Sequence, residues 1–468
     1  MISPDDQERV DAIEQALLAR WPETRIAPTT ERIAALVDIL GSPQLTYPTI
    51  HIGGTNGKTT TSRMVDSLLF AHGLRTGRFT SPHLETYRER ISINGEPIDP
   101  KELIFSYNDI AAYLDLMDTK FEHPISFFEA VTALAFAAFA EHPVDVGVIE
   151  VGMGGEWDAT NVVDADVSVI MPIGFDHMEY LGNTLHEIAA TKAGIIKEGG
   201  FVVLAQQEPE AAKELIRKAA EVGADVVREG VEFSVVSRAV AVGGQLLTIQ
   251  GIHETYDEIF LPLHGRHQAA NAAAALVAVE AFFGDQPLDI DAVRAGFAAV
   301  TSPGRCEVVH RDPTVILDAA HNPHGASALA DTFQSEFTFD DVIGQDAVKE
   351  FMQIKINAFK KTGRPVSHTL LLGFSGSGKT TLANVVANEM GVNFISVMGT
   401  RLKTWNDLYA FIKQIRENDV LFIDEIHCLT PKMQEHLYGL MEDFTYTVED
   451  KNMARPQTFN VPKFTLIG

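Results

Sequence analysis

Two stretches of this 468-residue chain each place an apolar strand, a glycine-rich loop ending in Gly-Lys-Thr, and a helix in direct succession. The first is TYPTIHIGGTNGKTTTSRMVDSLLF, with its loop at 53–61, and the second is HTLLLGFSGSGKTTLANVV, with its loop at 373–380. In such a loop the glycines let backbone N–H groups approach phosphate oxygens, the lysine neutralises charge, and the next hydroxyl can bind magnesium. We therefore expect an α/β chain with two nucleotide sites.

Further apolar runs indicate a parallel sheet. VDVGVIEVGMGG (144–155), ADVSVIMPIGFDH (165–177) and GGFVVLA (199–205) are almost continuously apolar, which is typical of strands buried on both faces. Helical stretches separate them, and residues 1–45 are also expected to be helical, most clearly at 31–40. This alternation predicts a doubly wound α/β sheet over the first ~300 residues.

Charge and composition exclude several classes of protein. The chain is 46% hydrophobic, and the longest strongly apolar run, 131–140, is about half of what spans a bilayer. Of 37 basic and 64 acidic residues, 14 and 16 lie from residue 336 onward, so the first 335 residues hold 23 and 48. This acidic part makes nucleic acid an unfavourable partner. Two distant cysteines and an acidic N-terminus without an apolar segment favour a cytoplasmic protein.

Polar residues at the predicted strand ends point to phosphoryl transfer. Ile52 replaces the first glycine of the full phosphate-loop pattern, but Lys58 and Thr59 are both present. Glu150 ends one strand, and Asp176 with His177 ends another. Because parallel strands end at one sheet edge, these side chains beside a phosphate loop favour a divalent-metal site.

Residues 1–335 resemble the folylpolyglutamate synthase/dihydrofolate synthase family of Mur-ligase-like, ATP-dependent amide ligases. The resemblance rests on nine ordered motifs: HIGGTNGKTT, TSPHLETYRERISING, SFFEAVTALAF, VIEVGMGGEWDATNV, GFDHMEYLG, TKAGIIK, HGRHQAANAAAAL, TSPGRCEVV and ILDAAHNPHGA. It implies that ATP phosphorylates a substrate carboxylate and that the amine of L-glutamate attacks the acyl phosphate. The implied acceptor is dihydropteroate or a folate, the implied cofactors are ATP and Mg²⁺, and the ligase part is expected to be monomeric.

The same resemblance implies roles for individual residues. Catalytic roles fall on Lys58, on Lys192 in carbamylated form, and on His321. The implied ATP contacts are Gly54, Thr55, Asn56, Gly57, Lys58, Thr59, Thr60, Asn271, Arg305 and Asp318. The implied metal ligands are Thr59, Ser81, Glu150 and His177. The implied pterin contacts are Ser126, Phe127, Phe128 and Glu129.

Residues 339–468 resemble the N-terminal ATPase part of the Holliday-junction branch-migration motor RuvB, an AAA+ protein. FDDVIGQDAVKE, the complete phosphate-loop pattern, LFIDEIH and FTLIG carry this resemblance, and residues 342–344 match the adenine-side stretch. It implies that Asp424 and Thr380 hold magnesium and that Glu425 polarises the attacking water. The implied nucleotide contacts are Gly373, Gly376, Gly378, Lys379, Thr380 and Thr381.

The two resemblances together predict a chimera of three parts. These are a Mur-ligase-like ATP-binding domain at 1–300, a shortened Rossmann-like ligase C-terminal domain at 301–337 and a partial AAA+ domain at 338–468. The leading hypothesis is folate–glutamate ligation, with activity reduced by the shortened domain. The alternatives are an oligomerising AAA+ fragment of a DNA motor and an inactive chimera.

Overall fold

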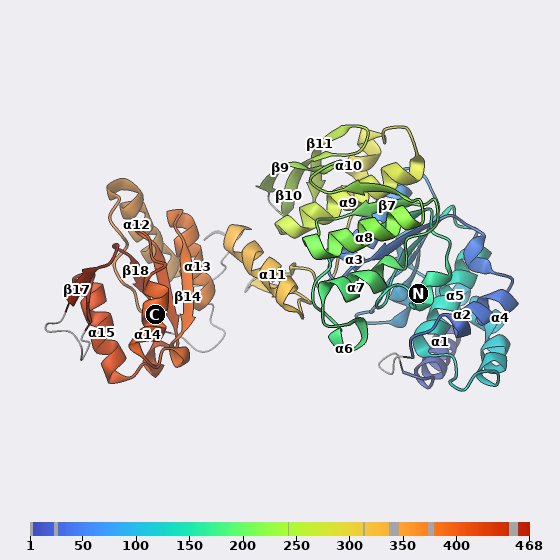
Figure 1. The fold of residues 1–468 in the computed structure, drawn as a ribbon, viewed down its shortest axis with the longest axis horizontal. Coiled ribbons are helices and arrows are strands. Elements are labelled where there is room, and N and C mark those ends of the chain that lie inside the picture. Colours follow the sequence, from blue (N-terminus) through green and yellow to red (C-terminus); the bar gives the residue numbers. More distant parts are fainter. Residues whose placement is uncertain are drawn as a thin grey trace. The chain divides into compact units, whose positions relative to one another are not determined.

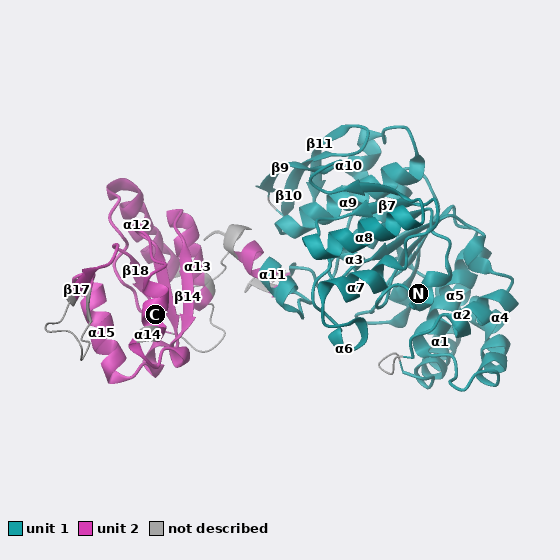
Figure 2. Ribbon diagram, viewed as in Figure 1, with its two compact units in different colours: residues 1–307, 318–328 teal, residues 308–317, 329–468 magenta. Residues whose placement is uncertain are grey.

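The computed structural model describes residues 3–22, 27–241, 243–311, 314–336, 346–372, 379–448 and 457–468. It divides the chain into two compact units (Figure 2). Unit 1 comprises residues 1–307 and 318–328, and unit 2 comprises residues 308–317 and 329–468. The division lies within the 301–337 stretch that the sequence assigns to a shortened ligase domain.

Unit 1 is built on one eight-stranded sheet in the order β4-β3-β2-β5-β1-β6-β7-β8. Figure 1 labels β7 of this sheet. The pairs from β2 to β8 are parallel, whereas β3 and β4 add antiparallel at one edge. The strands are β1 (Thr49–Gly53), β2 (Thr76–Phe79), β3 (Ile91–Ile93), β4 (Glu96–Pro97), β5 (Val146–Glu150), β6 (Val167–Ile170), β7 (Phe201–Leu204) and β8 (Asp225–Arg228). The α/β fold with a parallel-dominated sheet is therefore confirmed.

Helices cover both faces of this sheet, because alternate residues of its buried strands point to opposite sides. Val148 and Val169 pack with α3, α9 and α10, whereas Ile149 packs with α1, α2, α4 and α5. Ile170 packs with α7 and α8. The helices of this unit are α1 (Pro4–Leu18), α2 (Glu31–Ile39), α3 (Lys58–Ala71), α4 (Pro100–Asp118), α5 (Phe127–Glu141), α6 (Met178–Leu181), α7 (Leu185–Ala193), α8 (Pro209–Glu221), α9 (Arg266–Phe283) and α10 (Ile290–Ala298).

Local sequence patterns explain where several helices begin. Ser126 and Glu129 form a capping box at the start of α5, and Thr184 and Glu187 do the same for α7. Each pair satisfies N–H groups that the first helical turn leaves without a partner. The predicted helix at 31–40 is confirmed as α2, and the three predicted apolar strands are confirmed as β5, β6 and β7.

Smaller elements complete the described part of unit 1 and cross into unit 2. The antiparallel strands β9 (Ser234–Ala241), β10 (Gly244–Gln250) and β11 (Thr255–Leu261) form a sheet in the order β11-β10-β9. The strands β12 (Glu307–Arg311) and β13 (Thr314–Leu317) pair with each other, and α11 (Pro323–Glu336) follows.

Unit 2 contains a parallel sheet in the order β14-β15-β18. Residues 369–371 lie beside β18, since Thr369 N donates to Leu466 O and Leu371 N donates to Gly468 O. The strands of this sheet are β14 (Phe394–Met398), β15 (Val420–Asp424) and β18 (Thr465–Ile467), and the helices are α12 (Asp346–Thr362), α13 (Lys379–Met390), α14 (Trp405–Ile412) and α15 (Pro431–Glu442). The strands β16 (Thr445–Val448) and β17 (Gln457–Asn460) form a separate antiparallel pair.

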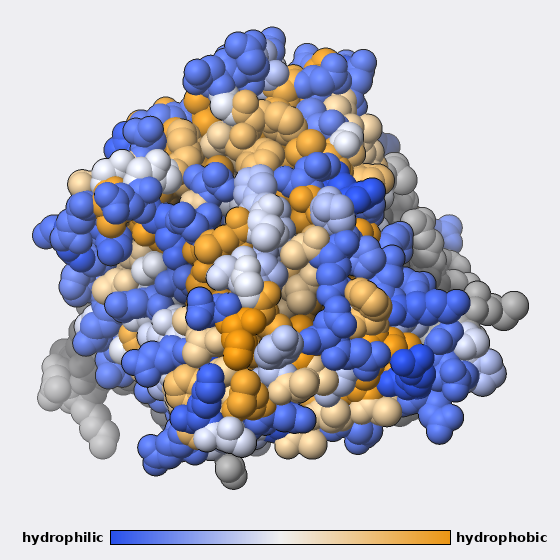
Figure 3. All heavy atoms as spheres, turned by 90° about the vertical axis from the view of Figure 1, so that its right-hand side faces the viewer, coloured by the Kyte–Doolittle hydropathy of each residue, from blue (hydrophilic) through white to orange (hydrophobic). Residues whose placement is uncertain are grey.

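Within the described residues, no helix has both the length and the apolar character needed to cross a bilayer. Figure 3 shows hydrophilic side chains over most of the periphery of one face and apolar ones toward its middle.

A buried ion pair offers a test of what stabilises unit 1. Arg78 Nη1 lies 2.6 Å from Asp66 Oδ2, with both side chains almost fully buried. Breaking a buried pair costs about 3–5 kcal/mol, since it leaves an uncompensated charge. We expect Arg78→Ala to lower the free energy of unfolding by that amount, measured by urea titration of tryptophan fluorescence in a Trp405→Phe background.

Arg228→Ala is the matched control, because Arg228 pairs with Glu232 at the surface. This variant should lose at most about 1 kcal/mol. Equal unfolding midpoints for the two variants would contradict the conclusion that the buried Arg78–Asp66 pair stabilises unit 1.

Candidate active site

The loop between β1 and α3 requires glycine at two positions. Gly54 and Gly57 have φ angles of 132° and 89°, which other residues rarely adopt. A Cβ atom on Gly54 would lie 2.7 Å from Met171 Cβ, and one on Gly57 would lie 2.7 Å from Asn271 Oδ1. The predicted nucleotide residue Asn271, on α9, therefore lies directly beside the loop. The N-terminus of α3 adds the partial positive charge that favours a bound phosphate.

Two lysine side chains donate to the same carbonyl oxygen of this loop. Lys58 Nζ lies 3.2 Å from Gly54 O and 3.1 Å from Thr55 O, and Lys192 Nζ lies 2.9 Å from Gly54 O. Burial lowers the pKa of Lys58, against the opposing charges of Glu150 and Asp176. Burial and then the charge of Lys58 lower the pKa of Lys192 to about 7. The loop therefore gathers two buried amines whose protonated form is disfavoured, and a bound anion would favour the protonated form again.

Glu150 brings three of the predicted metal ligands together. Its side chain is 1% exposed; Oε1 accepts a hydrogen bond from Thr59 Oγ1 at 2.7 Å, and Oε2 accepts one from the Ser81 amide at 3.2 Å. Burial raises the pKa of Glu150, and the charge of Lys58 opposes that shift. Hydroxyl and carboxylate oxygens are the ligands that Mg²⁺ prefers, so the Thr59 hydroxyl and the Glu150 carboxylate fit the implied ion, whereas the contact of Ser81 is made by its backbone amide.

The fourth predicted ligand, His177, belongs to a second group centred on Asp176. His177 Nε2 lies 3.9 Å from Asp176 Oδ1, and His321 Nε2 lies 3.7 Å from Asp176 Oδ2. Asn322 Nδ2 also donates to Asp176 Oδ2, at 3.3 Å. Among the described residues, we find no hydrogen bond or ion pair between His177 and Glu150. Asp176 thus brings together two predicted site residues that lie far apart in the sequence.

Asn56 joins the phosphate loop to the AHNP segment. Its side-chain amide exchanges hydrogen bonds with that of Asn322, at 2.9 and 3.3 Å, and lies 3.0 Å from His324 Nδ1. Asn322 and His324 were not among the predicted site residues, although both belong to the ILDAAHNPHGA motif. Asp158, which was also missed, is 3% exposed, and its charge raises the pKa of both Lys58 and Lys192.

Several of the remaining predicted ATP contacts already use their side chains in hydrogen bonds within the protein. Thr60 Oγ1 lies 2.9 Å from Ser302 Oγ in the interior, so only its backbone can face a nucleotide. Thr55 Oγ1 donates to Gly174 O and accepts from Gly174 N. Asp318 accepts from the backbone amides of residues 306 and 320, which fixes the turn that carries Arg305. The charge of Arg305 affects the pKa of both Lys58 and Glu150, which places it in the same electrostatic environment.

Two of the predicted pterin contacts have clear structural tasks. Ser126 and Glu129 cap α5, and Glu129 Oε1 also lies 3.0 Å from Arg32 Nε in a buried ion pair. Phe127 and Phe128 form the aromatic part of this segment. The Arg90 guanidinium carbon lies 5.0 Å from the centroid of the Phe127 ring. A Cβ atom on Gly152 would lie 2.4 Å from the Phe128 ring, so this ring covers the turn that follows Glu150.

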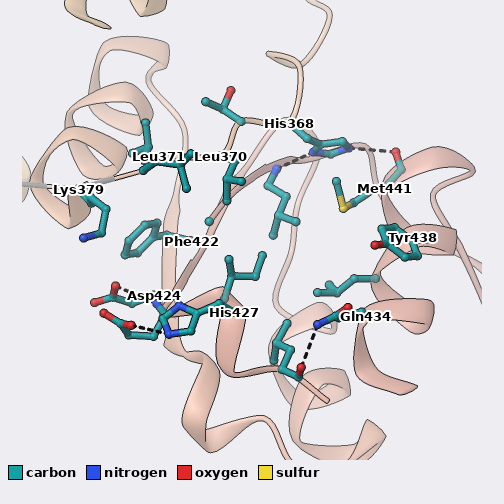
Figure 4. Close-up of a pocket in the computed structure, with 18 residues that line it drawn as sticks. His368, Leu370, Leu371, Lys379, Phe422, Asp424, His427, Gln434, Tyr438 and Met441 are labelled. Atoms are coloured by element: carbon teal, nitrogen blue, oxygen red, sulfur yellow. Dashed lines mark hydrogen bonds and ion pairs between the residues drawn. The ribbon is translucent and has the colours of Figure 1, made fainter. Parts of the chain in front are cut away.

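The second predicted site lies in unit 2 beside a cavity of about 560 Å³ (Figure 4). Lys379 begins α13, Asp424 ends β15, and both line the cavity together with Glu425. Thr380 is exposed in the first turn of α13, next to Lys379. The predicted loop contacts Gly373, Gly376 and Gly378, the side chain of Thr381, and the adenine-side residues 342–344 lie outside the described residues.

Comparisons with known proteins agree with both resemblances. A family model described as the Mur ligase middle domain matches residues 52–279, and one described as the Holliday junction DNA helicase RuvB P-loop domain matches residues 336–468. The dihydrofolate synthase/folylpolyglutamate synthase of Mycobacterium tuberculosis is 47% identical over 408 residues, which is 84% of this chain and 83% of the relative. The corresponding Bacillus subtilis protein is 39% identical over 317 residues, 67% of this chain and 73% of the relative.

Solved structures of folylpolyglutamate synthases also align with this chain. Mycobacterium tuberculosis folylpolyglutamate synthase complexed with ADP aligns with a TM-score of 0.69 and 44% identity, covering 89% of this chain and 82% of that one. A complex of folylpolyglutamate synthase with AMPPCP and folate aligns with a TM-score of 0.65 and 31% identity, covering 93% of this chain and all of that one.

The parallel sheet, the glycine-dependent loop and the matched middle domain define a Mur-type ligase fold. More narrowly, the chain belongs to the dihydrofolate synthase/folylpolyglutamate synthase family. The match to the Mycobacterium tuberculosis relative covers 84% of this chain, about 393 of its 468 residues, which exceeds the 335 that carry the ligase motifs. That alignment therefore overlaps the RuvB match beyond residue 336.

The low pKa of Lys192 predicts unusual amine reactivity. A neutral amine is nucleophilic, and a lysine with a pKa of about 7 becomes neutral between pH 6 and 8. We expect competitive labelling with acetic anhydride, read by peptide mass spectrometry, to rise over this range. Lys58→Ala should move the curve to higher pH, because the Lys58 charge lowers the pKa of Lys192. A labelling curve for Lys192 centred near pH 10 would contradict the lowered pKa of this lysine.

Proposed function

We propose that this chain joins L-glutamate to the carboxylate of dihydropteroate or of a folate, with consumption of ATP. The observation that carries the proposal is the convergence of Lys58, Thr59 and Glu150 at the carboxyl edge of the sheet. Relatives whose names state dihydrofolate and folylpolyglutamate synthesis support the substrate class. Solved relatives complexed with ADP, AMPPCP and folate support the nucleotide and the acceptor.

The proposed reaction has two steps. An oxygen of the substrate carboxylate attacks the γ-phosphorus of ATP, the bond to the bridging oxygen breaks, and ADP leaves. The glutamate amine then attacks the acyl carbon, the phosphate leaves with the former carboxylate oxygen, and the amine loses a proton. The α3 N-terminus and Lys58 stabilise the charge that moves through the phosphate.

Mg²⁺ would be held by Thr59 and Glu150, with Ser81 and His177 as the further ligands that the family resemblance implies. When bound, it neutralises phosphate charge and orients the transferred group. Glu150 is suited to this task because it is buried and already oriented by Thr59 and the Ser81 amide.

A carbamylated Lys192 would help to hold the Mg²⁺ ion. At a pKa of about 7 much of this amine is neutral, and a neutral amine can add to carbon dioxide. The product is an anion in place of an ammonium group. Because an ammonium group repels a metal and a carbamate attracts one, the modification would turn Lys192 into support for Mg²⁺.

The pterin is proposed to lie near the α5 N-terminus. Phe128 supplies aromatic surface there and reaches the turn after Glu150. Phe127 is 6% exposed, and the Arg90 guanidinium covers its ring, so Phe127 would act by supporting this end of α5. Stacking against aromatic rings is an effective way to hold a flat ring system. Ser126 and Glu129 would act by fixing this end of α5, because both side chains are occupied by capping.

Removing the loop lysine tests the nucleotide site directly. We expect Lys58→Ala, in a Lys379→Ala background that disables the second site, to lose most of its affinity for Mg–AMPPCP in calorimetric titrations. Single-turnover ligation should fall by roughly 10²–10³-fold, because a preorganised cation is lost. Lys197→Ala is the matched control, since Lys197 is a partly buried lysine that donates to Asn161 instead of the loop. Equal nucleotide binding by the Lys58 variant and its background would contradict the proposal.

A second nucleotide site in unit 2 is proposed on a separate observation. Lys379, Asp424 and Glu425 line one cavity, and the family model of a RuvB P-loop domain matches this part of the chain. Lys379 would contact phosphates, Asp424 and Thr380 would hold Mg²⁺, and Glu425 would polarise water. This arrangement supports the alternative hypothesis of an AAA+ module, whereas the ATP sites of an inactive chimera would bind nucleotide weakly or not at all.

DNA binding separates the AAA+ motor hypothesis from ligation. Counterion release by clustered lysines and arginines drives non-specific DNA binding, and the net charge of this chain is −27. We expect no specific complex with a four-way junction in gel-shift experiments at low salt. Sub-micromolar binding that Lys379→Ala or Glu425→Gln alters would favour the motor instead.

A further inference from the structure

We propose that Glu425, His427 and Cys428 of unit 2 form a binding site for a zinc-like divalent cation. Each side chain offers one donor atom, and the three donor atoms lie within 4.8 Å of one another. They are a carboxylate oxygen, an imidazole nitrogen and a thiol sulfur, all of which are established zinc ligands. The site is distinct from the predicted Mg²⁺ contacts Asp424 and Thr380.

The local backbone explains why these residues converge. Asp424 ends β15, and the chain then turns through the short helix η5 (Ile426–Cys428). The Cys428 amide donates to Glu425 O at 2.8 Å, which closes the turn. The apolar Ile426 lines the cavity together with Glu425 and His427. Figure 4 shows His427 close to Asp424. The turn thus carries all three donor groups within four consecutive residues.

The distance between the Glu425 and His427 donor atoms suits a tetrahedral ion. Zinc bonds of about 2.0–2.3 Å place neighbouring donor atoms roughly 3.3–3.8 Å apart. Glu425 Oε2 and His427 Nε2 already lie 3.3 Å apart. The His427 side chain is 74% exposed, and Cys428 is exposed and outside any disulfide, so small rotations can bring the sulfur into range. With three protein ligands, a fourth position would be left for water.

The chemistry of the donors selects the ion. Thiolate and imidazole favour Zn²⁺ and Co²⁺, whereas Mg²⁺ favours oxygen alone. A bound zinc-like ion would also occupy the Glu425 carboxylate, which the proposed second nucleotide site uses to polarise water. We therefore infer that this ion and ATP hydrolysis in unit 2 exclude each other. This consequence rests on the proposed function, but the metal site does not.

Cobalt titration of the full chain tests the site, because thiolate ligation of Co²⁺ produces an intense near-ultraviolet charge-transfer band. We expect one equivalent to produce this band in the wild type and added Zn²⁺ to remove it. Cys428→Ser should abolish the band. His427→Gln should weaken Co²⁺ binding by roughly tenfold or more, because losing even a residue that only hydrogen-bonds to a metal ligand typically weakens metal binding by that factor. Circular dichroism checks that each variant stays folded.

Cys306→Ala is the matched control. Cys306 is buried, and burial raises the pKa of its thiol to about 12, so it does not readily supply a thiolate. This variant should keep the full band. Absence of the band in the wild type, or equal bands in the wild type and Cys428→Ser, would overturn the proposal. Neither result bears on nucleotide binding by Lys58 or Lys379, so failure of the metal site remains distinguishable from failure of the proposed function.

Discussion

The parallel pairing of β1 with β5 and β6 is the constraint on which the candidate active site depends. In this register Ile52 pairs with Glu150, and Gly53 pairs with Ile170. The carboxyl ends of all three strands therefore meet at one sheet edge, where α3 also begins. Lys58 and Thr59 come from that helix, Glu150 from β5, and Asp176 from the segment after β6. A strand shifted by one residue would turn Glu150 toward the opposite face and separate it from Thr59.

Charge is the second constraint. Lys58 and Lys192 donate to one carbonyl oxygen, while Glu150 and Asp158 are buried nearby. Burial disfavours every one of these charges, as the pKa shifts of both lysines and both carboxyl groups show. The proposed phosphate and divalent cation would offset this cost, because the phosphate would pair with the lysines and the cation with the carboxylates. Under the proposed function, these charged groups are already positioned for ATP before it binds.

Much of the fold follows from local sequence, but the assembly of the site does not. Apolar runs located β5, β6 and β7, and the glycine pattern located the loop. Asp176, His177 and His321 were each named from the sequence, but their grouping was not predicted, since it joins residues across a long sequence separation that no periodicity records. Ser126 and Glu129 match the pattern of a helix cap, yet the family resemblance implied substrate contacts; the structure shows the capping bonds. In unit 2 the phosphate-loop glycines lie outside the described residues, so that motif rests on sequence.

The most direct test of the central claim is the fate of a carboxylate oxygen. Dihydropteroate labelled with ¹⁸O in its carboxylate would be incubated with the full chain, Mg–ATP and L-glutamate, and the released phosphate analysed by mass spectrometry. If ATP activates the carboxylate as an acyl phosphate, one labelled oxygen must leave with each phosphate that accompanies amide formation. The rate at which labelled phosphate appears should fall in Lys58→Ala by the same roughly 10²–10³-fold as ligation, because each labelled phosphate accompanies one amide bond. Amide formation with unlabelled phosphate, or labelled phosphate that is unaffected by loss of Lys58, would contradict the account.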